Sequence, residues 1–144
     1  MIRLFYTKIM VHHDGVRTRW SLKAPSAERK DHDVTLVHKP KLILYREDMS
    51  QLSVHAHKGI VNNLTKQMVF SEGVVIEADM GRLKTERIWF DPETRLLFTD
   101  SSFELTSERV ELEGNGLNIS QEARSLKVLD RVKVVFPGGL SDIT

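Results

Sequence analysis

The sequence contains no cysteine among its 144 residues. This absence excludes disulfide bonds, thiol catalysis and zinc sites built from cysteine. It does not assign a compartment, because a protein of an oxidising compartment can also do without disulfides. A chain of this length is typical of one domain and buries a core without cross-links. We therefore expect residues 1–144 to form a single domain.

Long apolar runs are also missing. The longest, such as residues 42–45, are far shorter than the roughly 18 residues that a membrane-spanning helix needs. Arg3 and Lys8 interrupt the only candidate for the apolar part of a signal peptide. An excess of charge of one sign is missing too, since 21 Lys and Arg residues stand against 20 Asp and Glu residues. This balance argues against a dedicated nucleic-acid-binding protein.

The charges are nevertheless unevenly distributed. Residues 1–60 hold 11 basic and 6 acidic residues, a net charge of +5, whereas residues 61–144 hold 10 basic and 14 acidic residues, a net charge of −4. All six histidines lie in the first of these parts. The clustering is either a chance feature of a solvated surface or a basic end that faces phosphate groups or an acidic partner.

Most of the chain has the pattern of β-strands. Runs rich in Val, Ile, Leu, Phe and Thr occupy residues 34–37, 41–45, 73–76, 96–99 and 132–136. Turn-forming clusters separate them at residues 62–63, 79–81, 91–94 and 113–116. Such runs between turns predict an all-β domain of many strands. Only residues 120–127 show a weak helical periodicity.

An internal repeat of fourteen residues is the strongest single feature. Five rows, which start at residues 56, 70, 84, 98 and 112, stay in register without a gap. Fourteen residues fit one strand of about ten and a turn of about four. Each row therefore predicts one crossing of a sheet. A weak point is expected near the middle of each row, at Gly59, Gly73, Arg87, Ser101 or Asn115.

One column of this register is apolar in every row. Its members are Val61, Val75, Trp89, Phe103 and Leu117. Provided that the weak points preserve the alternation of faces, the residues beside it are Val69, Leu83 and Leu97. An apolar column across successive strands predicts a continuous stripe on one side of the sheet. Periodicity leaves open whether the stripe is a filled core or the lining of a groove for an apolar ligand.

Motifs of enzymes are missing. The sequence has no glycine-rich phosphate loop, GxSxG elbow or HExxH motif. His55 and His57 are spaced to share one face of a strand, as in some β-barrel metal sites, but no acidic residue follows within residues 58–62. A cupin-like metalloprotein is therefore the weaker alternative, and no catalytic residue can be named.

Residues 14–24, which read DGVRTRWSLKA, resemble the opening of the LptC family. The resemblance continues through residues 40–45, the fourteen-residue rows with the paired segments 83–86 and 97–100, residues 114–117 and the last predicted strand. It covers about residues 10–136. Each short motif is unspecific, but their order and spacing together are specific. Members of this family are periplasmic components of the lipopolysaccharide export ABC transporter, and OstA-like domains of the same pathway are more loosely related.

The resemblance implies a single antiparallel β-jellyroll that is open along one side and shelters lipopolysaccharide acyl chains in its interior. Proteins of this kind take lipid from the inner-membrane transporter and pass it to the next periplasmic jellyroll. They are not enzymes and need no cofactor or metal. On this interpretation, the apolar column and the three residues beside it line the lipid-binding groove.

The resemblance also implies assembly through unpaired strand edges. An open jellyroll has free edges to which another protein can add a strand. We expect the N-terminal edge, near residues 16–24, to face the periplasmic domains of the transporter, and the C-terminal edge, at residues 132–136, to accept the next jellyroll or a second copy. The predicted edge residues are Trp20, Leu22 and Ala24 at the first edge and Val132, Val134 and Phe136 at the second.

The sequence departs from the family in one respect. Members usually begin with a transmembrane helix, and residues 1–13 contain no such segment. We therefore expect a periplasmic domain whose inner-membrane anchor lies on a segment missing from this chain. A natively soluble relative of the bridge type and a purely structural β-scaffold stay open as alternatives.

Overall fold

Alternating apolar and polar side chains give this chain thirteen strands. The computed structural model of the protein describes residues 2–4, 10–14, 17–46, 50–79, 81–120 and 125–135. These residues form strands and no helix, so the predicted all-β fold is confirmed. Within the same ranges, no helix is present that could cross a membrane.

The strands differ in length between the two parts of the chain. The first eight are short: β1 (Ile2–Leu4), β2 (Met10–Asp14), β3 (Arg17–Lys23), β4 (Ser26–Arg29), β5 (Val34–His38), β6 (Lys41–Tyr45), β7 (Gln51–His55) and β8 (Lys58–Asn62). The last five are long: β9 (Met68–Ala78), β10 (Gly81–Asp91), β11 (Leu96–Thr106), β12 (Glu111–Ser120) and β13 (Ser125–Val135). These five begin 13, 15, 15 and 14 residues apart, which confirms the predicted fourteen-residue register.

Two details differ from the sequence-based prediction. The first predicted row, residues 56–69, forms the short β8 and a turn rather than one long strand. The turn is closed by hydrogen bonds from the backbone N of Lys66 to the O of Asn62 (2.7 Å) and from the N of Asn62 to the O of Gln67 (2.9 Å). Residues 125–127 belong to β13, because their pairing with β12 overrides the weak helical periodicity.

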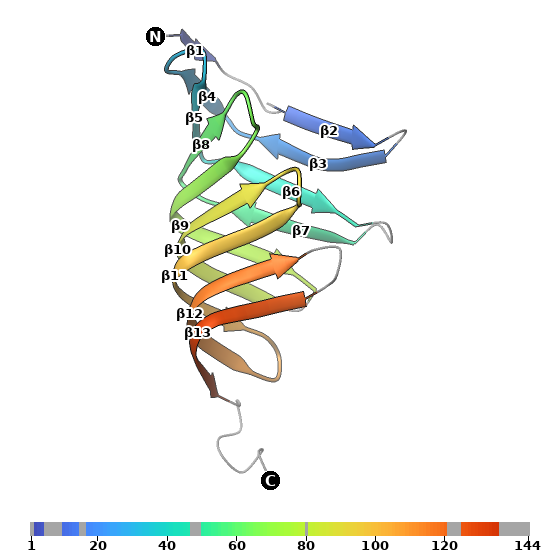
Figure 1. Ribbon diagram of the computed structural model, residues 1–144, viewed down its shortest axis with the longest axis vertical. Coiled ribbons are helices and arrows are strands. Elements are labelled where there is room, and N and C mark those ends of the chain that lie inside the picture. The colour runs from blue at the N-terminus through green and yellow to red at the C-terminus, as the bar shows by residue number, and fades with distance from the viewer. Residues whose placement is uncertain are drawn as a thin grey trace.

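All thirteen strands belong to one antiparallel sheet that branches at β9 (Figure 1). The main path runs β1-β4-β5-β8-β9-β10-β11-β12-β13, and the branch runs β9-β7-β6-β3-β2. Residues 68–71 of β9 pair with β8, and residues 75–77 pair with β7. The two groups of short strands are therefore joined through β9.

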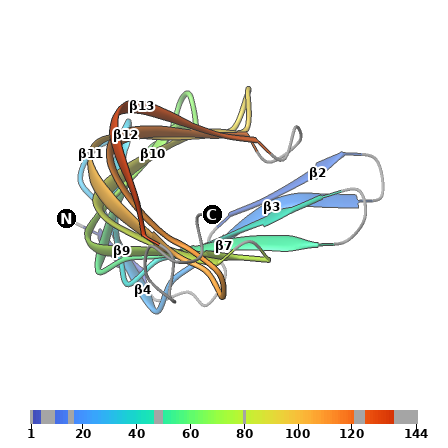
Figure 2. The same ribbon diagram turned by 90° about the horizontal axis from the view of Figure 1, so that it is seen from below.

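The long strands bend near their middle and fold the sheet into two arms. The pairing register shifts near residues 85–87 of β10, 99–102 of β11 and 114–115 of β12. Such shifts mark β-bulges, which bend a strand and increase its twist. We call the line of bulges the corner, the arm with β8 the first arm and the arm with β7 the second arm. Figure 2 shows the sheet curled around an interior and left unclosed between β13 and β2, as in an open β-jellyroll.

Two glycines allow strands to turn the corner. Gly73 in β9 and Gly116 in β12 have φ angles of 70° and 75°. This left-handed region costs a residue with a Cβ atom roughly 1–2 kcal/mol. A Cβ atom at Gly116 would also lie 2.9 Å from the Cβ of Leu129 on β13. Glycine is thus favoured there by the backbone angle and by the closeness of the next strand.

We expect the substitution Gly116→Ala to lower the free energy of unfolding by about 1–3 kcal/mol, because it combines left-handed strain with a steric clash. Chemical denaturation measures this loss. In a Leu129→Gly background, which removes the Cβ of residue 129, the clash is relieved and the left-handed strain at residue 116 is kept, so the same substitution should cost less there. An equal cost in both backgrounds would contradict the close approach, and no cost in either would contradict the bent backbone.

Candidate lipid-binding interior

Apolar side chains at alternating positions line the interior of the curled sheet. In the first arm, one row of cross-strand neighbours consists of Val61, Met68, Phe90, Leu97, Ile119 and Leu126. In the second arm, a matching row consists of Val54, Ile76, Leu83, Leu105, Leu112 and Val134. The buried members of both rows belong to a single hydrophobic cluster. The two arms therefore share one apolar interior.

An aromatic contact joins the arms across this interior. Trp20 on β3 is 3% exposed and meets Phe90 on β10 edge to face, with ring centroids 6.0 Å apart and an interplanar angle of 78°. Edge-to-face pairs of this kind add about 0.5–1.5 kcal/mol beyond their burial. Trp20 belongs to the second arm and Phe90 to the first, so this contact fixes the distance between the arms where β3 faces β10.

The interior is closed at its N-terminal end and more open at its C-terminal end. In the second-arm row, Val54, Ile76 and Leu83 are at most 3% exposed. Further along the same row, Leu105 and Leu112 are half-buried and Val134 is 43% exposed. The first-arm row changes in the same direction, from a buried Ile119 to a half-buried Leu126. Apolar surface is thus accessible to a ligand at β12 and β13.

The structure brings five of the eight predicted groove residues into the interior. Val61, Leu83, Leu97, Phe103 and Leu117 are each at most 2% exposed and belong to the hydrophobic cluster. Within this packed interior they are in contact with other apolar side chains, and Phe103 in addition lines a hollow over β10 to β13. Contact of these five residues with lipid remains a prediction.

The other three predicted groove residues lie on the outer face. Val69, Val75 and Trp89 are half-buried, and each alternates with buried neighbours on its strand. Trp89 pairs with Val69 and Phe98, stacks against the Phe98 ring at 5.7 Å and lies under the Arg87 guanidinium at 5.7 Å. The expectation of one continuous stripe is therefore wrong.

Two physical effects divide the predicted column. Successive strands run in opposite directions, so residues at the same offset from the corner fall alternately on the first and second arms, as for Val61 and Val75. The bulges then change which face a residue takes, because an unpaired residue breaks the alternation. In β10, the buried positions pass from Leu83 and Thr85 to Ile88 and Phe90.

The predicted N-terminal edge is wrong. β3 pairs with β2 on one side and with β6 on the other, so its backbone is used on both sides. Trp20, Leu22 and Ala24 are buried in the hydrophobic cluster and are not exposed on an edge. The sequence could not reveal this, because residues 10–14 carry little strand pattern and yet form β2.

The predicted C-terminal edge coincides with the end of the main path. Among the residues that the structure describes, β13 pairs only with β12, and it contains Val132 and Val134. Phe136 lies outside the described residues. Docking of another protein on β13 remains a prediction.

Two buried threonines form a polar seam at the corner, which the sequence analysis missed. Thr85 Oγ1 donates a hydrogen bond to the backbone O of Ser102 at 2.9 Å, and the backbone N of Ser101 donates to Thr99 Oγ1 at 3.0 Å. Both backbone groups lie in the irregular stretch between Phe98 and Phe103, where β11 has no register partner on β10. Because backbone groups shielded from water need partners, the buried hydroxyls of Thr85 and Thr99 stabilise the bulge at the edge of the apolar interior.

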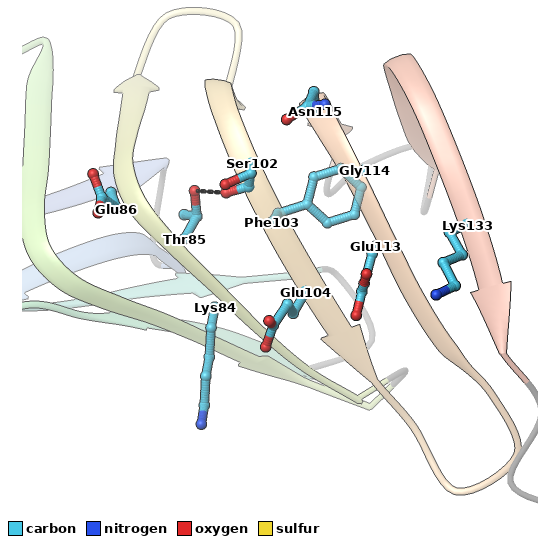
Figure 3. Close-up of a pocket in the computed structure, with 10 residues that line it drawn as sticks. All are labelled: Lys84, Thr85, Glu86, Ser102, Phe103, Glu104, Glu113, Gly114, Asn115 and Lys133. Carbon is cyan, nitrogen blue, oxygen red and sulfur yellow. Dashed lines mark hydrogen bonds between the residues drawn. The ribbon is translucent and has the colours of Figure 1, made fainter.

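A polar hollow of about 540 Å³ lies over β10 to β13 (Figure 3). One charged residue from each strand forms a cross-strand row along it: Lys84, Glu104, Glu113 and Lys133. Figure 3 shows these four side chains side by side, and it also shows Phe103 from the predicted column. The charged walls distinguish this hollow from the apolar interior.

The two histidines of the metal hypothesis belong to different parts of the fold. His55 ends β7 and pairs with Lys41 and Val75, whereas His57 lies in the connection to β8. Within the described ranges, no group of three or more metal-binding side chains occurs. Among the residues that the structure places, no third ligand joins the pair.

An open antiparallel β-jellyroll with an apolar interior is the class of protein that these observations define. The family model described as lipopolysaccharide-assembly, LptC-related, matches residues 7–136. The chain belongs to this family, as the sequence resemblance predicted, and membership implies a role in lipopolysaccharide transport. No curated protein matches the chain.

We expect Thr99→Val to lower the free energy of unfolding by about 1–2 kcal/mol, because the partly buried N–H of Ser101 loses its acceptor. Chemical denaturation of the variant measures the loss. Thr106→Val, at an exposed position on the same strand, is the matched control and should change stability by less than about 0.5 kcal/mol. Equal effects of the two substitutions would show that the seam is not required by the bulge.

Proposed function

We propose that this protein is a non-enzymatic carrier that shelters lipopolysaccharide acyl chains against its apolar interior and passes them along a periplasmic bridge. The observation that carries the proposal is the change in burial along the interior rows, from closed at β9 and β10 to open at β12 and β13. Family membership supports the choice of ligand. The carrier would receive lipid from the inner-membrane transporter.

The energetics favour such a surface. Each methylene group removed from water contributes about 0.8 kcal/mol, so shielding ten of them contributes roughly 8 kcal/mol. Half-buried side chains such as Leu112 and Leu126 already expose apolar area on which an acyl chain can lie. Insertion deeper into the rows would require closely packed side chains to move, which protein interiors resist. We therefore place the proposed lipid contact at β12 and β13.

Pairs of adjacent residues that face opposite sides of β12 and β13 test this placement. A photo-crosslinking amino acid at Leu112 or Leu126 should give an adduct with lipopolysaccharide on irradiation of cells, because both side chains pack toward the interior. The same amino acid at the exposed neighbours Glu113 or Lys127 should give several-fold less. Adducts are measured by immunoblotting of the purified protein. Equal adducts on both sides, or adducts only at the exposed positions, would reject the interior as the lipid site.

A structural β-scaffold is the second candidate function. It is favoured by the close packing of Val61, Leu83, Leu97 and Leu117, which leaves little space in that part of the interior. A scaffold of this kind gives no lipid adduct from either Leu112 or Leu126. The crosslinking experiment therefore separates the two candidates.

We further propose that β13 accepts the next periplasmic jellyroll by strand addition. A free edge presents a row of backbone donors and acceptors, which another strand can use. β13 has eleven residues for such pairing. Its exposed apolar residue Val134 would become covered in the process, and the same edge could also pair with a second copy.

Two lysines of one cross-strand row provide the test of this edge. A photo-crosslinking amino acid at Lys133 on β13 should capture the next jellyroll, whereas one at Lys84, equally exposed but on the inner strand β10, should not. Mass spectrometry identifies the captured protein. Capture from Lys84 alone would place the interface on the outer face, and a homodimer captured from Lys133 would replace the heterologous partner with a second copy.

A further inference from the structure

A second hollow, of about 400 Å³, lies at the corner on the outer face of the first arm. We call it the corner pocket; its polar lining consists of Ser26, His38, Lys39, His57, Lys58 and Glu72. Ser26 pairs with His38, and His38 pairs with Lys58 across the strands. Ala27 and Val37, the neighbours of Ser26 and His38 along their strands, are buried in the interior. The corner pocket is therefore on the opposite side of the sheet from the apolar rows.

Backbone hydrogen bonds hold the walls of the pocket together. The N of Lys39 donates to the O of His57 at 2.8 Å, and the N of His57 donates to the O of Glu72 at 3.0 Å. The His57 ring lies over Gly73, where an added Cβ atom would be 3.2 Å from Cδ2 of His57. Three connections between the arms thus meet here, and the pocket is formed before any ligand binds.

Basic groups outnumber acidic ones in this lining. Lys58 Nζ lies 3.6 Å from Glu72 Oε2, and His38 Nε2 lies 3.5 Å from Glu28 Oε1. The side chains of Lys39 and His57 take part in none of the ion pairs or hydrogen bonds that the described residues form. The pocket therefore keeps an ammonium group and an imidazole available to a ligand, with the Ser26 hydroxyl at its rim.

This combination fits a phosphate group. Lysine and histidine donate short charge-assisted hydrogen bonds to phosphate oxygens, and a concave site with an excess of one sign of charge concentrates ions of the other sign. The volume lies within the range of small-molecule sites, so there is space for the phosphate and for part of the group that carries it. The basic residues of this pocket all lie within residues 1–60, the part of the chain with a net positive charge.

We propose that the corner pocket binds a phosphate group, with Lys39, His57 and Lys58 as the principal contacts. The site is independent of acyl-chain binding, because it lies on the other face of the sheet. The phosphate can belong to a free phosphorylated molecule or to the headgroups of a lipid surface. Both sources present the same chemistry to the three side chains.

Titration of the isotope-labelled protein with inorganic phosphate tests the site by NMR. The amide signals of residues 38–39 and 57–58 should shift in a saturable manner. Lys39→Gln and His57→Gln should each weaken binding at least about fivefold, since each removes one charge-assisted contact. Lys127→Gln, which removes an exposed positive charge outside the pocket, should leave the Kd unchanged. An unchanged Kd in the two pocket variants, or no saturable shift in the wild-type protein, would overturn the proposal.

A substitution that is expected to strengthen phosphate binding provides a control, because a misfolded variant would not bind phosphate more tightly. Glu72→Gln removes the carboxylate that competes for Lys58, so phosphate should bind about threefold or more tightly. Glu86→Gln removes an equally exposed carboxylate outside the corner pocket and should have no such effect. Equal changes in the two variants would assign the effect to overall charge and would contradict a specific site.

Vesicles distinguish the two sources of phosphate. Binding of the protein to phosphatidylglycerol vesicles but not to phosphatidylcholine vesicles, with loss in Lys39→Gln and His57→Gln, would assign the pocket to a lipid surface. Binding of inorganic phosphate without vesicle binding would assign it to a free phosphorylated ligand. Vesicle binding that is the same in the wild-type protein and in both pocket variants would place membrane contact elsewhere.

Discussion

The structure depends on one geometric constraint: each long strand must bend at the same level as its neighbours. A strand that passed straight through the corner would leave one arm without its share of the hydrogen-bond ladder. The bulges in β10, β11 and β12 fall side by side for this reason, and β9 is bent by its left-handed residues Glu72 and Gly73. The cost of bending is local, since Thr85 and Thr99 pair with the backbone groups that the β11 bulge releases.

The bend determines which surfaces the molecule presents. It turns one face of the sheet inward, where both arms contribute to a single apolar cluster, and the opposite face outward, where the corner pocket lies. The contact between Trp20 and Phe90 holds the arms together near β3, whereas Leu112 on β12 and Leu126 on β13 are only half-buried. Apolar side chains at that end are therefore less covered. The closely packed end of the interior therefore stabilises the fold, and the opposite end, at β12 and β13, is accessible to a ligand.

The repeat of strands could be predicted from the sequence, but the face of the sheet on which each side chain lies could not. Turn-forming residues every fourteen positions and apolar runs between them predicted the long strands, and Gly73, Arg87, Ser101 and Asn115 marked the corner, because polar and small residues tolerate a bulge there. The direction of each strand, and the face that its side chains take after each bulge, depend on how the strand pairs with its neighbours. Aligning the rows of the repeat gives no information about that pairing. Val75 and Trp89 were misplaced for this reason.

The edges and the corner pocket could not be predicted either, because they also depend on which strands pair. Trp20 and Leu22 have the pattern of any buried strand, and only their pairing with both β2 and β6 shows that β3 is internal. The pocket residues His38, Lys39, His57 and Lys58 come from two segments that are separated in the sequence, and β5 brings them together by pairing with β8. The clustering of basic residues and histidines in the first part of the chain was the only signal available.

The fourteen-residue unit also limits how a fold of this kind can change its length. Neighbouring strands lie about 4.8 Å apart, so each added unit would lengthen the stack by roughly that distance. Because adjacent strands are antiparallel, one extra unit reverses the direction of every strand after it and exchanges the arms at the C-terminal edge. Two extra units, roughly 28 residues, lengthen the stack by about 10 Å and leave the final strand with its original direction. Such a domain can therefore gain or lose whole hairpins while keeping the same terminal surface.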